Sequence, residues 1–376
     1  MKAVVFLLSL VFLALPVGAA LPVPPPPQVD ARAWLLIDSD SGLPLAEKNA
    51  DAPVEPASLT KLMTAYLAFS ALKEGRLALD QQLPVSEKAW KAEGSRMFLD
   101  PKKPAKVDDL LKGMIVQSGN DACIVLAEAI AGSEDGFAAM MNDMAKRLGL
   151  TGTHYLNSTG LPHPQHVTTA RDLARLSSAL IRTFPEFYKL YSMKEFRYNG
   201  ITQPNRNRLL FMDPSVDGVK TGHTENAGYC LIASARRDQR RLLSVVLGTS
   251  SDSARAMESQ KLLNYGFQFF ETVRLYPGNQ AVSTLRLFKG SKSDAKAGFL
   301  SDFYVTVPRG TGNRIQAQVI SQQPLLAPLR RGQRIATLRL SVDGSPLADY
   351  PLVALETVEV AGLIGRTWDN LLLMFK

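Results

Sequence analysis

The chain has 376 residues, of which 46% are hydrophobic, and its formal net charge is +8 at pH 7. The positive charge is spread along the chain without an arginine or lysine stripe, so we expect an anionic surface or polymer as a neighbour and no nucleic acid. The length exceeds what one ordinary hydrophobic core supports, which predicts two domains.

Residues 1–20 have the pattern of a secretory signal peptide. Lys2 precedes the largely apolar run 3–17, and Gly18-Ala19-Ala20 supplies small residues for cleavage. A membrane span is the alternative, but the run is too short and prolines follow it at once. We therefore expect an exported protein without a transmembrane helix after cleavage.

The run 57–72 is apolar on nearly every face, which predicts a central, buried helix that begins near Pro56. Inside it lie Ser58 and Lys61, whose spacing of three places them on one helix face. Burial lowers the pKa of a lysine and allows it to act as a base. A serine in a first helical turn lies near unpaired backbone N–H groups that suit an oxyanion. The pattern therefore indicates a serine nucleophile with a lysine base.

The Ser-x-x-Lys pattern occurs three times, so the position of each copy must decide which serine is the candidate nucleophile. Ser70 and Lys73 lie at the end of the same predicted helix, where a solvated lysine complements the helix dipole. Ser293 and Lys296 lie in a polar stretch that we interpret as a loop. Only Ser58 lies at the start of a buried helix.

The remaining patterns up to residue 271 predict an antiparallel sheet flanked by helices, with a helical middle. Strands are expected at 33–38, 44–47, 229–236 and 242–247, with a hairpin turn at 237–239. Helices are expected at 108–116, 121–131, 134–148, 169–181 with Thr169 and Asp172 near a capping box, and from a cap at Asp252 or Ser253 to Phe270.

The texture changes at Thr272, where short alternating segments separated by turns begin. Strands are expected at 282–287, 303–307, 314–320 and 335–340, with a turn at 342–344. We therefore expect a first domain at 21–271 and a small all-β domain at 272–362, which contains no catalytic cluster.

Two further short motifs follow the serine and lysine of the central helix. Ser118 and Asn120 flank a glycine between two predicted helices, and Lys220, Thr221 and Gly222 lie in a strand context. Taken alone, the Ser118 motif is best interpreted as an ordinary turn with a helix cap. The Lys220 motif alone is best interpreted as an edge strand protected by its lysine. A glycine in a strand also permits close approach of another backbone.

Ser-x-x-Lys, Ser-x-Asn and Lys-Thr-Gly in this order are motifs of class A β-lactamases and penicillin-binding proteins. Around them, residues 56–66, 118–123, 203–207 and 216–235 resemble the low-molecular-mass penicillin-binding proteins that are D-alanyl-D-alanine carboxypeptidases. The resemblance extends over nearly the whole mature chain. It implies an α+β serine transpeptidase/β-lactamase-like domain followed by a small all-β domain, with no cofactor and no metal.

The resemblance also implies a partner and a place. The substrate would be a peptidoglycan stem peptide ending in D-Ala-D-Ala, and β-lactams would be covalent inhibitors. The protein would be periplasmic and attached to the outer face of the cytoplasmic membrane.

The resemblance further implies catalytic roles for five residues. Ser58 would be the acylated nucleophile and Lys61 its general base. Ser118 and Asn120 would relay protons and hold the substrate backbone. Lys220 would neutralise charge near the nucleophile and help to protonate the leaving group.

Five more residues would bind the substrate. Thr221 would hydrogen-bond the terminal carboxylate, next to Gly222, and the backbone N–H of His223 would complete the oxyanion hole with that of the nucleophile. Arg206 and Arg255 match the family's arginines near the substrate's terminal carboxylate, to which a guanidinium can donate two parallel hydrogen bonds. Their alternative is an ordinary surface position.

Other candidate groups are interpreted structurally. His163 and His166 lie in a proline-rich loop without a carboxylate or cysteine cluster, so we expect loop histidines and no metal. His223 as the base of a Ser-His-Asp triad is disfavoured by its place after Lys-Thr-Gly. Cys123 and Cys230 could pair, but each lies in an apolar element, which favours free buried thiols.

Several functions compete with the carboxypeptidase. The same residues could cut an internal D-Ala bond, which would make the protein an endopeptidase. A non-catalytic cell-wall-binding protein would be expected to have lost one of the three motifs, and all three are intact. A class A β-lactamase deacylates through Glu-x-x-Leu-Asn, whereas Thr153 stands three before Leu156-Asn157 here. This substitution predicts slow hydrolysis of β-lactams.

The tail 363–376 has an apolar face at helical spacing, formed by Ile364, Trp368, Leu371, Leu372 and Phe375. It is too short to span a bilayer, which takes about 20 residues. We expect an interfacial helix on the membrane surface, and the alternative is a helix packed on the second domain.

Overall fold

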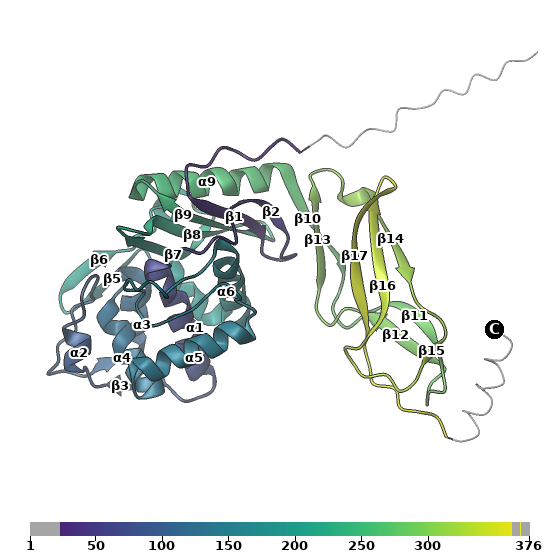
Figure 1. Ribbon diagram of the computed structural model, residues 1–376, viewed down its shortest axis with the longest axis horizontal. Helices are drawn as coiled ribbons and strands as arrows, with labels where there is room; N and C mark the ends of the chain where they lie inside the picture. The colour runs from purple at the N-terminus through teal and green to yellow at the C-terminus, as the bar shows by residue number, and fades with distance from the viewer. Residues whose placement is uncertain (1–22, 363–368, 370–376) are drawn as a thin grey trace, which may run out of the picture.

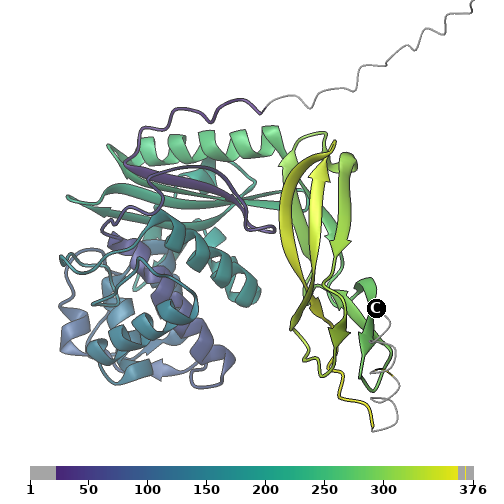
Figure 2. The same cartoon turned by 45° about the vertical axis from the view of Figure 1, so that its right-hand side comes forward.

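The computed structural model describes residues 23–362 and residue 369, so the predicted signal peptide 1–20 lies outside the described residues. The same holds for the predicted anchor 363–376 except Asp369. A mixed α/β body and an elongated β body lie side by side in both views (Figures 1 and 2). None of the helices in the described residues has the length and apolarity to span a bilayer.

The first body is built on a five-stranded antiparallel sheet with the order β2-β1-β9-β8-β7. Its strands are β1 (Ala33–Asp38), β2 (Pro44–Lys48), β7 (Val216–Thr224), β8 (Gly228–Arg237) and β9 (Arg240–Thr249). The four strands expected on this sheet are confirmed, and Asp238 turns the predicted hairpin with a φ of 54°.

The sheet separates two hydrophobic cores because successive side chains of each strand point to opposite faces. In β1, Leu35 and Ile37 pack into the core of the helical layer. Trp34 and Leu36 pack into a second core with the long helix α9. Figure 1 shows α9 on one side of the sheet and α1 and α6 on the other.

The longer helices are α1 (Lys61–Lys73), α3 (Val107–Lys112), α4 (Asn120–Ala131), α5 (Glu134–Arg147), α6 (Ala170–Thr183) and α9 (Asp252–Phe269). Short helical segments are η1 (Ala57–Thr60), α2 (Glu87–Trp90), η2 (Gly113–Gln117), α7 (Pro185–Tyr188), η3 (Lys189–Ser192), α8 (Leu209–Met212) and η4 (Gly312–Arg314). Two small hairpins join β3 (Gln82–Leu83) to β4 (Ala105–Lys106) and β5 (Glu195–Tyr198) to β6 (Ile201–Pro204).

The central helix is buried as predicted, but it does not begin as a regular α-helix. Ten of the 13 residues of α1 are buried, and the preceding turn η1, which carries Ser58, is a 3₁₀ helix. The helix expected at 108–116 likewise widens into the π-helix η2. Both irregular turns lie at motif serines. A 3₁₀ turn is common at a helix N-terminus, whereas a π-helical turn is frequent at functional sites.

The helix caps follow the prediction in one case and differ in two. Thr169 caps α6 by accepting from the N–H of Asp172. The carboxylate of Asp172 does not close a capping box, because it accepts from Gly152 N and Thr153 Oγ1 instead. The cap of α9 is Ser251, not Asp252 or Ser253, because Ser251 Oγ accepts from Ala254 N.

The second body is built of β-strands, as predicted, with the short helical turn η4 between β13 and β14. Its six-stranded sheet has the order β14-β16-β17-β12-β11-β15, and β10 pairs with β13 beside it. The strands are β10 (Phe270–Tyr276), β11 (Ala281–Phe288), β12 (Asp294–Gly298), β13 (Phe303–Pro308), β14 (Ile315–Ile320), β15 (Leu325–Leu326), β16 (Arg334–Val342) and β17 (Ser345–Ala354). The loop expected around Ser293 and Lys296 was wrong in part, since Lys296 lies in β12 opposite Thr284.

Candidate active site

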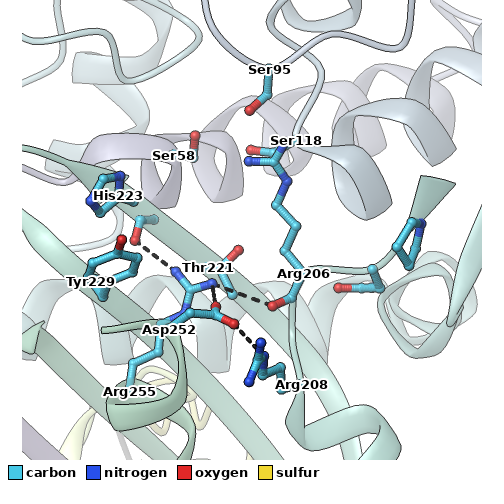
Figure 3. Close-up of a pocket in the computed structure, with 13 residues that line it drawn as sticks. Ser58, Ser95, Ser118, Arg206, Arg208, Thr221, His223, Tyr229, Asp252 and Arg255 are labelled. Carbon is cyan, nitrogen blue, oxygen red and sulfur yellow. Dashed lines mark hydrogen bonds and ion pairs between the residues drawn. The ribbon is translucent and has the colours of Figure 1, made fainter. Parts of the chain in front are cut away.

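The three motifs meet at one cavity of about 500 Å³. Figure 3 shows Ser58, Ser118 and Thr221 around it, with Arg206 and Arg255 extending toward the same space. Its lining consists of Ser58, Ser95, Ser118, Pro204, Asn205, Arg206, Arg208, Thr221, Gly222, His223, Tyr229, Asp252 and Arg255.

Ser58 and Lys61 are in direct contact, because Lys61 Nζ donates to Ser58 Oγ at 3.0 Å. The lysine is 1% exposed, and burial lowers its pKa to about 8, with a further lowering by the cation of Arg206. Ala57, immediately before the serine, has a φ of 47°, a conformation that non-glycine residues rarely adopt and that is concentrated at functional sites. The turn thus aims a hydroxyl at an amine that is easily deprotonated.

A loop after α5 holds the lysine from its other side. Lys61 Nζ also donates to the carbonyl of Thr159 at 2.6 Å. Asn157 Oδ1 accepts from the N–H groups of Thr159 and Gly160, and Ser158 donates from its N–H and its hydroxyl to Glu134 Oε1. The loop is therefore fixed by side chains whose polar groups are paired.

Ser118 and Lys220 form a second serine–lysine contact. Lys220 Nζ donates to Ser118 Oγ at 3.0 Å and to Thr221 O at 3.1 Å. Ser118 follows the π-helix with a φ of 65°. Burial lowers the pKa of Lys220 well below its ordinary value, and the neighbouring cations of Lys61 and Arg206 lower it further. Two amines with lowered pKa values therefore serve the two motif serines.

Only one of the two polar side-chain atoms of Asn120 has a hydrogen-bond partner within the described residues. Its Nδ2 donates to the carbonyl of Glu93 at 2.6 Å, whereas its buried Oδ1 has no hydrogen-bond partner within the described residues. The contact fixes the segment 93–95, and Ser95 from that segment lines the cavity. The sequence gives no motif for Ser95, because a loop brings it to the site.

The strand β7 supplies the far wall. Thr221 is 5% exposed and lines the cavity. A Cβ on Gly222 would lie 3.2 Å from Leu59 Cγ, so glycine permits the close approach to η1 that its place in a strand predicts. The ring of His223 packs 4.1 Å from that of Tyr229, a residue that the motifs did not single out.

Arg206 and Arg255 both reach the cavity, but they are bound differently. Arg206 Nη2 donates to Gln117 Oε1 at 3.3 Å. Arg255 donates to the carbonyls of Gly222, at 3.2 Å, and of Arg206, at 3.5 Å, and also to Asp252. Burial lowers the pKa of both guanidinium groups. The sequence singled out Asp252 only as a candidate helix cap, and it gave no signal for its second partner Arg208.

The histidine, the cysteines and the second Ser-x-x-Lys pair that we interpreted as structural take no part in the contacts between the motif residues. His166 is buried, its Nε2 lies 2.9 Å from Thr60 Oγ1, and burial lowers its pKa to about 4. No cluster that could hold a metal occurs within the described residues. Cys123 and Cys230 are free and buried, as expected. Lys73 donates to a backbone carbonyl and not to Ser70.

The fold and the site together define a serine penicillin-binding-type fold. The sheet has helices on both faces, one serine–lysine pair lies at the start of a buried helix, and a second pair faces the same cavity. Residues 21–251 match the family described as D-alanyl-D-alanine carboxypeptidase, and residues 270–360 match the C-terminal domain of penicillin-binding protein 5. The chain therefore belongs to the D-alanyl-D-alanine carboxypeptidase family. The predicted family, fold and enzyme class are confirmed.

Relatives match over nearly the full length. The chain is 45% identical to D-alanyl-D-alanine carboxypeptidase DacC of Escherichia coli, with 93% of this chain and 89% of DacC covered. It is 40% identical to DacA of the same organism, over 94% and 90%. Among solved structures, penicillin-binding protein 5 of Haemophilus influenzae is 39% identical with a TM-score of 0.85, covering 89% of this chain and 99% of that one.

Proposed function

We propose that the protein removes the terminal D-alanine from peptidoglycan stem peptides through an acyl-enzyme on Ser58. The contact between Ser58 Oγ and Lys61 Nζ carries this proposal. Once the lysine has lost its proton, its lone pair can accept the serine proton while Thr159 O still holds the nitrogen. Attack on the penultimate carbonyl then gives an oxyanion, which the N–H groups of Ser58 and His223 would stabilise.

The second serine–lysine pair completes the proposed cycle. Lys220, in contact with Ser118, would pass a proton to the leaving amine, so D-alanine departs as the acyl-enzyme forms. Asn120 would hold the peptide backbone of the substrate. Water then attacks the ester and releases the shortened peptide.

The terminal carboxylate would lie on the opposite side of the cavity. Thr221 and Arg255 line that side, and a hydroxyl and a cation suit a carboxylate, whereas the Arg206 side chain extends toward Ser118 (Figure 3). Two structures of penicillin-binding protein D2 from Listeria monocytogenes, 33% identical to this chain, are of its ampicillin-bound and cefotaxime-bound forms. We infer that β-lactams acylate Ser58 in the same cavity.

We further propose how the chain is arranged in the cell. Residues 1–20 would be removed on export, 21–271 would act in the periplasm, 272–362 would form the second domain, and 363–376 would attach the protein to the membrane surface. The charged start, apolar run and small residues at the N-terminus support export, and the apolar face of the tail supports attachment.

Intact mass spectrometry after brief exposure to penicillin, followed by peptide mapping, tests the acyl-enzyme. We expect one penicilloyl adduct at Ser58, none in Ser58→Ala, and a normal adduct in the matched control Ser70→Ala. An adduct at Ser70, or none in the wild type, would disprove the assignment.

A further inference from the structure

A carboxylate of the protein itself occupies the side of the cavity where the substrate's carboxylate is proposed to bind. Asp252, the first residue of α9, lines the cavity with three arginines. Its Oδ1 accepts from Arg255 Nη2 and its Oδ2 from Arg208 Nε. Figure 3 shows this carboxylate between the two guanidinium groups.

The two arginines differ in how much they depend on that carboxylate. The Arg255 side chain is 7% exposed, so its charge is separated from water and needs a nearby anion. Its other acceptors are the neutral carbonyls of Gly222 and Arg206. The Arg208 side chain is 57% exposed and also donates to Ser253 Oγ. Asp252 is thus the anion that balances the charge of Arg255.

Helix capping does not account for this position. Ser251 already caps α9 through Ala254 N. An acidic residue in the first turn favours a helix wherever its side chain points, but here the carboxylate turns into the cavity and meets two cations. Water reaches it as well, because one third of the side chain is exposed.

We propose that Asp252 is an internal competitor for the substrate's terminal carboxylate and so sets the KM of the enzyme. When the substrate arrives, its carboxylate takes the place of Asp252 on Arg255, and Arg208 keeps the displaced Asp252 at the edge of the cavity. The inference rests on the proposed carboxypeptidase function, in which Arg255 faces that carboxylate.

The same competition would act after the first chemical step. Free D-alanine retains its carboxylate, and it must leave before water reaches the ester. When Asp252 returns to Arg255, it replaces the product's carboxylate and weakens product binding. A cavity with three guanidinium groups and no internal anion would hold D-alanine more tightly.

The test compares Asp252→Asn with wild type on a diacetyl-Lys-D-Ala-D-Ala peptide and on its C-terminal amide. Asparagine keeps the shape and one acceptor but removes the charge. We expect KM for the acid to fall about threefold, as for a partly exposed ion pair, with KM for the amide unchanged. Inhibition by added D-alanine should become stronger by a similar factor.

Two variants serve as controls. Asp252→Glu keeps the charge and should restore the wild-type KM, and Asp349→Asn removes an exposed carboxylate from an ion pair in the second domain and should change nothing. Penicilloyl adduct formation at Ser58 reports the folded fraction of each variant. If Asp252→Asn does not fold, Asp252→Ser removes the same charge and takes its place.

The outcomes separate the inference from the function on which it rests. A KM for the acid that is unchanged or raised in a folded, active Asp252→Asn variant shows that Asp252 only orders Arg255, and overturns the inference. A wild type that releases no D-alanine refutes the proposed function, and the inference falls with it.

Discussion

Lys61 Nζ lies 2.6 Å from the carbonyl oxygen of Thr159, on a loop 98 positions further along the chain. The same nitrogen lies 3.0 Å from Ser58 Oγ, so the amine is held between a fixed acceptor and the nucleophile. A lysine has four rotatable side-chain bonds, and this second contact removes much of that freedom. The carbonyl accepts a hydrogen bond from the amine in either protonation state.

The acylation rate should depend on pH through this lysine. Burial lowers the pKa of Lys61 to about 8, and only the neutral amine can accept the serine proton. The second-order rate constant for acylation by penicillin should therefore rise about tenfold per pH unit at low pH and level off above about pH 8. Stopped-flow measurement over a pH series checks this.

Replacement of the base gives the matching control. Lys61→Ala should slow acylation by about 100- to 10,000-fold and abolish the pH dependence, while the fold is retained. A Lys61→Ala variant that acylates at near the wild-type rate would exclude Lys61 as the base.

Glu134 should matter for acylation although it lies outside the cavity lining. Its buried carboxylate accepts from Ser158 N at 3.1 Å and Ser158 Oγ at 2.7 Å, next to the Thr159 carbonyl that holds Lys61. Glu134→Ala leaves both donors unpaired, so we expect a loss of about 1–3 kcal/mol in the free energy of unfolding and slower acylation. Denaturant unfolding and the acylation rate measure the two effects.

Glu134→Gln is the control, because its amide oxygen can still accept both hydrogen bonds and only the contact with the exposed Lys88 loses its charge. It should acylate nearly as fast as wild type. Equal acylation by the alanine and wild-type enzymes would show that the loop holds its shape without Glu134.

The motifs predicted which residues meet, because their types are tied to local structure. Ser58 and Lys61 share a helix face at any helical pitch close to the ordinary one, so the 3₁₀ turn did not disturb the prediction. Lys220 and Thr221 were expected in a strand context, and both lie in β7. Gly222 was expected where backbones approach closely, and η1 packs against it.

The remaining cavity residues came from tertiary contacts that no local pattern encodes. Ser95 reaches the cavity because Asn120 fixes its loop. Asp252 does so at the start of α9, where Arg255 of the same helix contacts both Asp252 and the carbonyl of Gly222 in β7. The cap of α9 was misplaced by one or two residues, since Ser251, Asp252 and Ser253 are all good caps. Strand β12 was missed because it lies in a polar stretch, 289–298, whose glycines and lysines are typical of a loop.

The penicilloyl adduct should persist far longer than the acyl-enzyme formed from a D-Ala-D-Ala peptide. Thr153 stands where a class A β-lactamase has its deacylating glutamate, and its hydroxyl is hydrogen-bonded to Asp172. Within the described residues, neither Ser58 nor Lys61 is hydrogen-bonded or ion-paired to a carboxylate. The decay of the adduct, followed by mass spectrometry, measures this lifetime, and rapid turnover of penicillin would favour a β-lactamase instead.

The last prediction concerns the tail 363–376, which lies outside the described residues except for Asp369. Its apolar residues recur at helical spacing and include Trp368, a side chain that favours the headgroup region of a bilayer. Deletion of 363–376 should release the protein from membrane pellets while the penicilloyl adduct at Ser58 forms at the wild-type rate. Trp368→Ser should weaken pelleting in part, whereas Trp90→Ser, at an exposed tryptophan of the first body, should not. A truncated protein that still pellets with membranes would place the anchor elsewhere.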